Sequence, residues 1–78
     1  MYMTPDVAYK VTRGNTDGST KIDDIIYVDK EDDSIVVPRW GKRFNKEELT
    51  DSVTDFECEI DPTWEIIRTP NNVFVKRE

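Results

Sequence analysis

The hydrophobic residues of this chain fall into short runs that are typical of β-strands, because they either alternate with other residues or are β-branched and aromatic. Val7, Tyr9 and Val11 repeat with the period of a half-buried strand. Residues 25–28 are continuously apolar, which indicates a strand covered on both faces. Residues 35–37 predict a third strand, which forms a hairpin with the second.

At the start of the second half of the chain, the apolar residues no longer follow the two-residue repeat of a strand. Asn45 followed three residues later by Glu48 predicts a capping box and one or two helical turns. Residues 56–60 then alternate apolar and acidic side chains, which is the clearest strand pattern in the chain. Two more short strands are expected at residues 64–67 and 73–75, separated by turn-forming residues.

Five or six short strands with one helical turn predict a mainly β fold. We expect a small SH3-like antiparallel barrel or a curled five- to six-stranded sheet, and the alternative is an open α+β sheet. The 78 residues are expected to form a single domain, 1–78, with frayed ends at residues 1–5 and 76–78.

Composition narrows the classes of partner. The net charge of −6 should repel nucleic acid and anionic membranes at long range, so we expect neither as a direct partner. The only cysteine, Cys58, cannot form an intrachain disulfide and is expected to be a buried, inert thiol. Residues 1–5 do not match a signal peptide and no apolar run approaches the ~20 residues of a membrane span. These features predict a cytoplasmic protein.

Candidate catalytic chemistry is lacking in the sequence. The chain has no histidine, which is the commonest general acid–base and metal ligand. Residues 29–40 begin like a calcium loop, but Ser34 stands where the turn needs glycine and Trp40 where a glutamate should bind. We therefore expect a non-enzymatic protein with no catalytic residues, no metal site and no cofactor.

A basic segment, residues 39–46, places four cationic side chains around Trp40 and Phe44. Aromatic and cationic residues mixed in this way can stack bases and hold phosphates. The favoured interpretation is that both aromatic side chains enter the core while the cations offset the acids that follow. Trp40 also remains a candidate anchor for a protein partner, since tryptophan is enriched at binding hot spots.

The next stretch, residues 47–65, carries eight acidic side chains and no basic one. Four of them should share one face of the strand at steps of about 6.6–6.8 Å, close to the spacing of phosphates along a nucleic-acid backbone. An acidic face of this kind can occupy a basic groove meant for DNA or RNA, although it can also be a solvated polar face. The predicted strand-face residues are Asp55, Glu57, Glu59 and Asp61, extended by Glu47, Glu48 and Asp51.

Several short motifs resemble a loose group of small uncharacterised proteins encoded by phages and mobile elements of Gram-positive bacteria. The resemblance extends from about Tyr9 to Glu59, and Asp23 stands where those proteins tend to have glycine. It implies an acidic phage protein that inhibits host defence, as anti-CRISPR proteins do. The motifs are Tyr9-Lys10-Val11-Thr12, Asp17-Gly18-Ser19, Asp24-Ile25-Ile26-Tyr27, Lys46-Glu47-Glu48-Leu49 and Asp55-Phe56-Glu57.

The leading hypothesis is thus an acidic binding protein that occupies the basic groove of a host nucleic-acid-binding defence enzyme. The alternative is a structural or assembly module of a phage particle, which would contact another protein through a sheet edge or residues 39–46. A third possibility is a single-strand nucleic-acid binder acting through Trp40 and Phe44. The oligomeric state is left open by the sequence.

Overall fold

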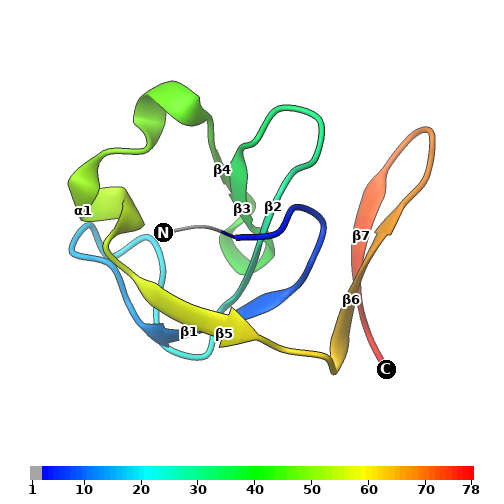
Figure 1. The fold of residues 1–78 in the computed structure, drawn as a ribbon, viewed down its shortest axis with the longest axis horizontal. Helices are drawn as coiled ribbons and strands as arrows, with labels where there is room; N and C mark the ends of the chain where they lie inside the picture. Colours follow the sequence, from blue (N-terminus) through cyan, green and yellow to red (C-terminus); the bar gives the residue numbers. More distant parts are fainter. Residues whose placement is uncertain (1–2) are drawn as a thin grey trace.

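A curled five-stranded antiparallel sheet and a separate two-stranded hairpin make up the fold (Figure 1). The computed structural model describes residues 3–78. The large sheet has the strand order β4-β3-β2-β1-β5, and β6 pairs with β7 as the C-terminal hairpin. The strands are β1 Tyr9–Arg13, β2 Ile25–Val28, β3 Ile35–Val37, β4 Lys42–Phe44, β5 Glu57–Ile60, β6 Trp64–Arg68 and β7 Val73–Arg77. The helical segments are η1 Pro38–Trp40, η2 Lys46–Glu48 and α1 Asp51–Thr54.

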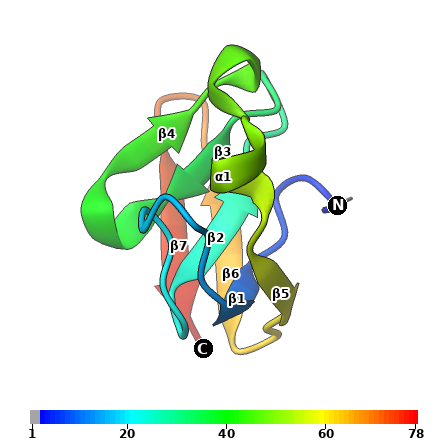
Figure 2. The ribbon, with the colours of Figure 1, turned by 90° about the vertical axis from the view of Figure 1, so that its left-hand side faces the viewer.

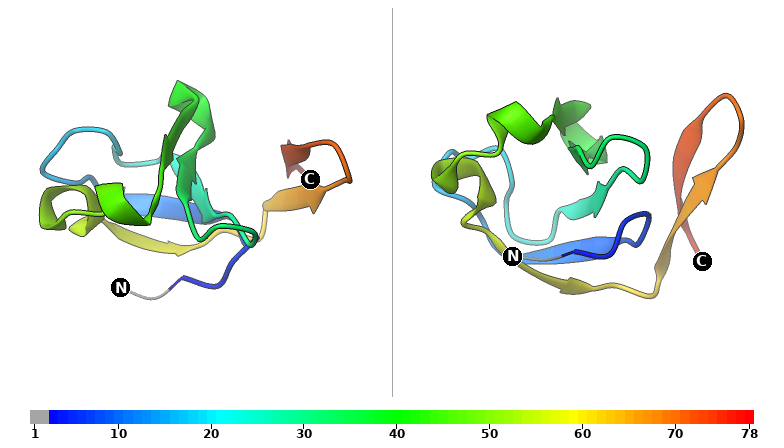
Figure 3. Two further views of the ribbon diagram at one scale, coloured as in Figure 1. Left: turned by 90° about the horizontal axis from the view of Figure 1, so that it is seen from above. Right: turned by 45° about the horizontal axis from the view of Figure 1, so that its top comes forward.

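The prediction of a mainly β, curled sheet with a short helical part is confirmed (Figure 3). Within residues 3–78 no pairing joins the two edge strands, β4 and β5, so the sheet is not a closed barrel. Residues 3–78 form seven strands instead of the expected five or six. The sequence did not indicate β4, because two of its three residues, Lys42 and Arg43, are charged.

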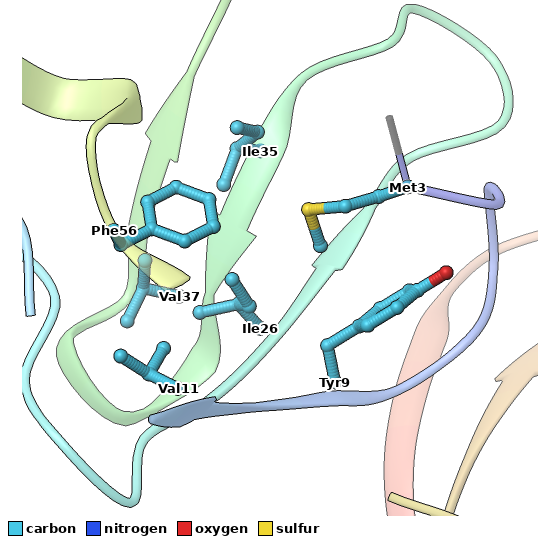
Figure 4. Close-up of a cluster of buried hydrophobic side chains, with 7 residues drawn as sticks. All are labelled: Met3, Tyr9, Val11, Ile26, Ile35, Val37 and Phe56. Atoms are coloured by element: carbon cyan, nitrogen blue, oxygen red, sulfur yellow. The ribbon is translucent and has the colours of Figure 1, made fainter. Parts of the chain in front are cut away.

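The concave face of the sheet holds the hydrophobic core (Figure 4). The register places Tyr9 opposite Ile26, and residues directly opposite each other share a face of the sheet. Phe56, between α1 and β5, is only 2% exposed and fills the centre of this face. The core cluster consists of Met3, Tyr9, Val11, Ile26, Ile35, Val37 and Phe56.

The opposite face of β2 and β3 is covered by the C-terminal hairpin, which runs behind the sheet in Figure 2. Tyr27 lies opposite Val36 on this face, and both side chains are buried. Trp64 and Val75 line one cavity together with Ile25 of β2, so the hairpin turns this side toward the sheet. The expectation that residues 25–28 are covered on both faces is therefore confirmed.

Within the described residues no backbone pairing connects the hairpin to the sheet. The side chain of Arg68 makes polar contacts that join the two. Its Nε donates to Asp6 Oδ2 at 2.8 Å, and its Nη2 donates to Asp29 Oδ1 at 2.8 Å. Asp29, at the end of β2, is only 4% exposed and also accepts a bond from Arg43 Nη1 at 2.9 Å. One buried carboxylate thus binds guanidinium groups from both layers of the molecule.

These contacts lower the pKa values of both aspartates. The hydrogen bonds from Arg68 lower the pKa of Asp6 below its ordinary value of 3.8. Burial by itself raises the pKa of Asp29, but the Glu31 amide and the guanidinium groups of Arg43 and Arg68 outweigh it. The net effect at Asp29 is also a lowered pKa. Both carboxylates therefore stabilise the fold in their charged form.

Both ends of the described chain make defined contacts. Met3 is buried in the core, and the amide of Thr4 donates to the Tyr9 hydroxyl at 2.9 Å. At the other end β7 extends to Arg77, and the amide of Glu78 donates to the Thr63 carbonyl at 2.8 Å. Residues 1–2 of the expected frayed segment lie outside the described residues.

Replacing Arg68 with glutamine should loosen the hairpin from the sheet, because it leaves Asp29 buried with one guanidinium partner instead of two. We expect Tm to fall by at least ~5 °C at neutral pH. Thermal unfolding followed by circular dichroism measures the change. Arg77→Gln is the matched control, because Arg77 is an exposed hairpin residue with no ion pair within residues 3–78. An Arg68→Gln variant that melts with the control would contradict this role.

Acid should remove the same stabilisation. Folding lowers the pKa values of Asp6 and Asp29. The charged carboxylates therefore add to the free energy of unfolding in full above the ordinary pKa of 3.8, and this stabilisation is lost as the pH falls through the lower pKa values of the folded state. We expect Tm of the wild type to drop below about pH 4, and the drop to be smaller in Arg68→Gln. Melting curves between neutral pH and pH ~2.5 test this. An equal drop of Tm with falling pH in the wild type and in Arg68→Gln would refute this expectation.

Candidate binding surfaces

The predicted acidic residues follow one continuous stretch of chain, from η2 through α1 into the edge strand β5 (Figure 1). Six of them are exposed, and Asp61 is partly buried. We call this set the acidic surface. Its members are Glu47, Glu48, Asp51, Asp55, Glu57, Glu59 and Asp61.

The expectation that four carboxylates lie along one strand is wrong, because β5 is shorter and contains only Glu57 and Glu59 of the four. Asp55 lies before the strand and accepts bonds from the amide, at 2.8 Å, and the hydroxyl of Thr16. Asp61 lies after it and accepts bonds from the amide and hydroxyl of Thr63 at 3.0 and 2.6 Å. These bonds lower the pKa values of both aspartates. Asp55 ties the start of β5 to the loop after β1, and Asp61 fixes the turn that follows β5.

Cations of the neighbouring strand offset part of the charge on β5. Glu57 lies opposite Arg13, with an ion pair of 3.7 Å between Arg13 Nη1 and Glu57 Oε2, and Glu59 lies opposite Lys10. The ion pair contributes little, because both side chains are largely exposed. The sequence did not reveal these neighbours, since it does not show which strand lies beside β5.

The η2 segment begins with the predicted capping box. The Asn45 side chain accepts the Glu48 amide at 3.1 Å, and the Glu48 side chain accepts the Asn45 amide at 3.3 Å. Glu47, Asp51 and Glu59 form no ion pair within residues 3–78. Lys10 and Arg13 balance only part of the charge of the seven carboxylates of the acidic surface, so a clear excess of negative charge faces solvent.

The two aromatic residues of the basic segment have different surroundings. Phe44 lies opposite Ile35 in the register and packs against the core, as expected. Trp40 is 48% exposed, so the expectation that it also enters the core is wrong. The chain turns at Gly41, which has a φ of +63°, a backbone conformation that glycine adopts without strain. Phe44 thus packs against the core, whereas Trp40 faces solvent.

A buried carboxylate holds Trp40 in place. The Asp24 side chain is fully buried, and its Oδ2 accepts the Trp40 indole Nε1 at 3.3 Å and the Lys21 amide at 2.9 Å. Its Oδ1 accepts Arg39 Nη1 at 3.2 Å. Lys21 Nζ and Arg39 Cζ lie over the Trp40 ring, at 5.6 and 5.1 Å from its centroid. Nothing in the sequence links Asp24 and Lys21 to Trp40, which lies 16 residues beyond Asp24.

Beside the Trp40 ring lies a cavity of about 250 Å³, which we call the Trp40 hollow. Its rim is held by the buried side chain of Asn15, whose Oδ1 accepts the Gly18 amide at 2.9 Å. The Asn15 Nδ2 donates to the Ser19 hydroxyl at 2.8 Å and to the Val53 carbonyl at 3.0 Å. The hollow is lined by Gly18, Ser19, Lys21, Trp40 and Lys42.

The β2–β3 loop and Cys58 are two further places where the sequence raised a candidate metal ligand or reactive group. Within residues 3–78 no three His, Cys, Asp or Glu side chains are grouped as metal ligands would be. Asp32 of the loop accepts the Ser34 amide at 3.0 Å, a local turn contact. Cys58 is half-buried, and burial raises the pKa of its thiol. No helix in the described part of the chain is both long and apolar enough to cross a membrane.

The two surfaces differ in construction as well as in charge. The acidic surface follows one stretch of chain, whereas the Trp40 hollow combines the loop after β1 with η1 and the start of β4. Trp40, the candidate anchor for a protein partner, lies in the cationic hollow and not among the acidic residues. A scan of protein-family models and searches of curated proteins and of solved structures found no match to this chain.

Proposed function

We propose that this protein is a non-enzymatic binding protein whose acidic surface occupies the basic nucleic-acid groove of a bacterial enzyme and thereby inhibits it. The observation that supports this most is the run of exposed carboxylates from Glu47 to Glu59, which no lysine or arginine interrupts. Ordinary protein surfaces intersperse charges of both signs. A surface with an excess of negative charge attracts a positively charged partner and speeds its association.

The spacing of these carboxylates fits a groove that normally holds phosphates. Glu57 and Glu59 project from alternate positions of β5, which corresponds to a step of about 6.6–6.8 Å. Because β5 is an edge strand, one side of this row has no neighbouring strand among the described residues. Lysines and arginines that bind phosphates in the groove would meet carboxylates at a similar spacing.

A host defence enzyme is the partner we favour, with the inhibitor acting in the cytoplasm of the bacterial cell. This sharper form of the proposal rests on the resemblance to proteins of phages and mobile elements, among which small acidic inhibitors such as anti-CRISPR proteins occur. A nuclease that needs its nucleic-acid groove open would be inhibited simply because the groove is occupied. Such a mechanism requires no catalytic group on the inhibitor.

A second candidate function is an assembly module of a phage particle, and the open sheet edges favour it. Both β4 and β5 have one side without a strand partner within residues 3–78. An open edge can accept an extended segment of another protein through backbone hydrogen bonds. Such a contact depends little on salt, whereas a contact between opposite charges weakens as salt screens it over about 8–10 Å.

Replacing Glu57 and Glu59 with glutamine should weaken partner binding by roughly tenfold or more, because each removed carboxylate leaves a cation of the groove unpaired. The control, Glu65→Gln/Glu78→Gln, changes the net charge equally at two exposed residues of the hairpin region. Tagged proteins are used to capture partners from host lysate, and the retained enzyme is quantified by mass spectrometry. Equal retention by the two double variants would contradict the role of the acidic surface.

The wild-type capture also separates the two candidate functions. Elution with stepwise salt should release a nucleic-acid-binding enzyme at moderate salt, and added DNA should compete for it. Capture of structural proteins that resist both salt and DNA would favour the assembly module. A failure to capture any nucleic-acid-binding protein would overturn the proposed inhibition.

A further inference from the structure

We propose that the Trp40 hollow is a second binding site, which takes the carboxylates of an acidic segment of a partner protein. The site lies on different elements from the acidic surface and has the opposite charge. It therefore stands independently of the proposed inhibition. The acidic surface would bind one partner and the hollow another, or a different part of the same partner.

The hollow collects positive charge in a molecule whose net charge is −6. Lys21 and Lys42 line it, both are exposed, and neither has a carboxylate within 4.0 Å in residues 3–78. Arg39 adds a third cation, with 64% of its side chain exposed despite its bond to Asp24. Lysines that form no ion pair within the described residues can bind carboxylates of another molecule without first breaking one.

The site is held ready for a ligand by two buried polar side chains. Asp24 binds the Lys21 backbone, the Arg39 guanidinium and the Trp40 indole together, and Asn15 fixes the rim at Gly18 and Ser19. A binding group held in position in the free protein loses less entropy when the ligand arrives. The exposed Trp40 adds apolar contact area, which can pack against the methylene groups of a glutamate side chain.

An acidic peptide fits these contacts better than a single-stranded nucleic acid does. A stacked base needs a free indole face, but Lys21 and Arg39 already lie over the Trp40 ring. A stacked base would compete with these cations for the ring, whereas a carboxylate can bind the cations where they are. The volume of about 250 Å³ suits one or two side chains, since pockets for drug-sized ligands usually begin near ~300 Å³.

Binding of a labelled short peptide of alternating glutamate and glycine, measured by fluorescence anisotropy at low salt, tests the site. Lys21→Gln/Lys42→Gln should weaken binding roughly tenfold, because both carboxylate partners are lost. Lys10→Gln/Lys76→Gln is the matched control with the same change in net charge, and its affinity should stay within about twofold of wild type. In wild-type protein the peptide should also shift the Trp40 indole resonance in NMR spectra and leave that of Trp64 in place.

Each other outcome contradicts the proposal in a different way. An equal loss of peptide affinity in the test and control variants would show that the hollow is not a specific site. The absence of measurable peptide binding by the wild type would show the same. An oligothymidylate of equal charge that binds more tightly at Trp40 would assign the hollow to nucleic acid. A second copy of this chain as the occupant would appear as self-association that depends on concentration and is abolished by Lys21→Gln/Lys42→Gln.

Discussion

The buried carboxylate of Asp29 is the contact on which the arrangement of this small protein depends. It binds Arg68 of the hairpin and Arg43 of the sheet at 2.8 and 2.9 Å, and the two layers share no backbone pairing among the described residues. A buried charge is costly unless it is paired, so this set of partners favours one position of the hairpin. That position covers Tyr27 and Val36, which would otherwise expose the outer face of the central strands. A chain of 78 residues thereby gains a second apolar interface besides its core.

A second buried carboxylate, Asp24, organises the surface in a similar way. It draws Trp40 and Arg39 toward the loop after β1 and so keeps a large aromatic side chain at the surface instead of in the core. The acidic surface is built differently, because Asp55 binds the loop after β1 and Asp61 fixes a local turn, while the glutamates face solvent. The folded molecule therefore keeps the separation of charge that the sequence shows in consecutive segments. This separation is the basis of both proposals for binding.

Local patterns predicted the features of the fold that depend on near neighbours in the chain. Apolar periodicity located most strands, and the spacing of Asn45 and Glu48 predicted the capping box, because both depend on residues a few positions apart. Features that depend on the register were not visible. Phe44 and Trp40 have similar sequence surroundings, but only Phe44 lies opposite a core residue of β3. The buried roles of Asp24 and Asp29 were missed for the same reason, since Arg39 and Arg68 lie 15 and 39 residues away.

The most direct test of the separation of charge uses paramagnetic nitroxides dissolved with the isotope-labelled protein. A cationic and an anionic nitroxide of equal size report the local electrostatic potential, because each is enriched near charge of the opposite sign. The account predicts stronger relaxation by the cationic probe along residues 47–61 and by the anionic probe around Lys21 and Lys42. A similar ratio of the relaxation caused by the two probes over the whole surface would contradict the account, because no part of the molecule would then attract a partner by its charge.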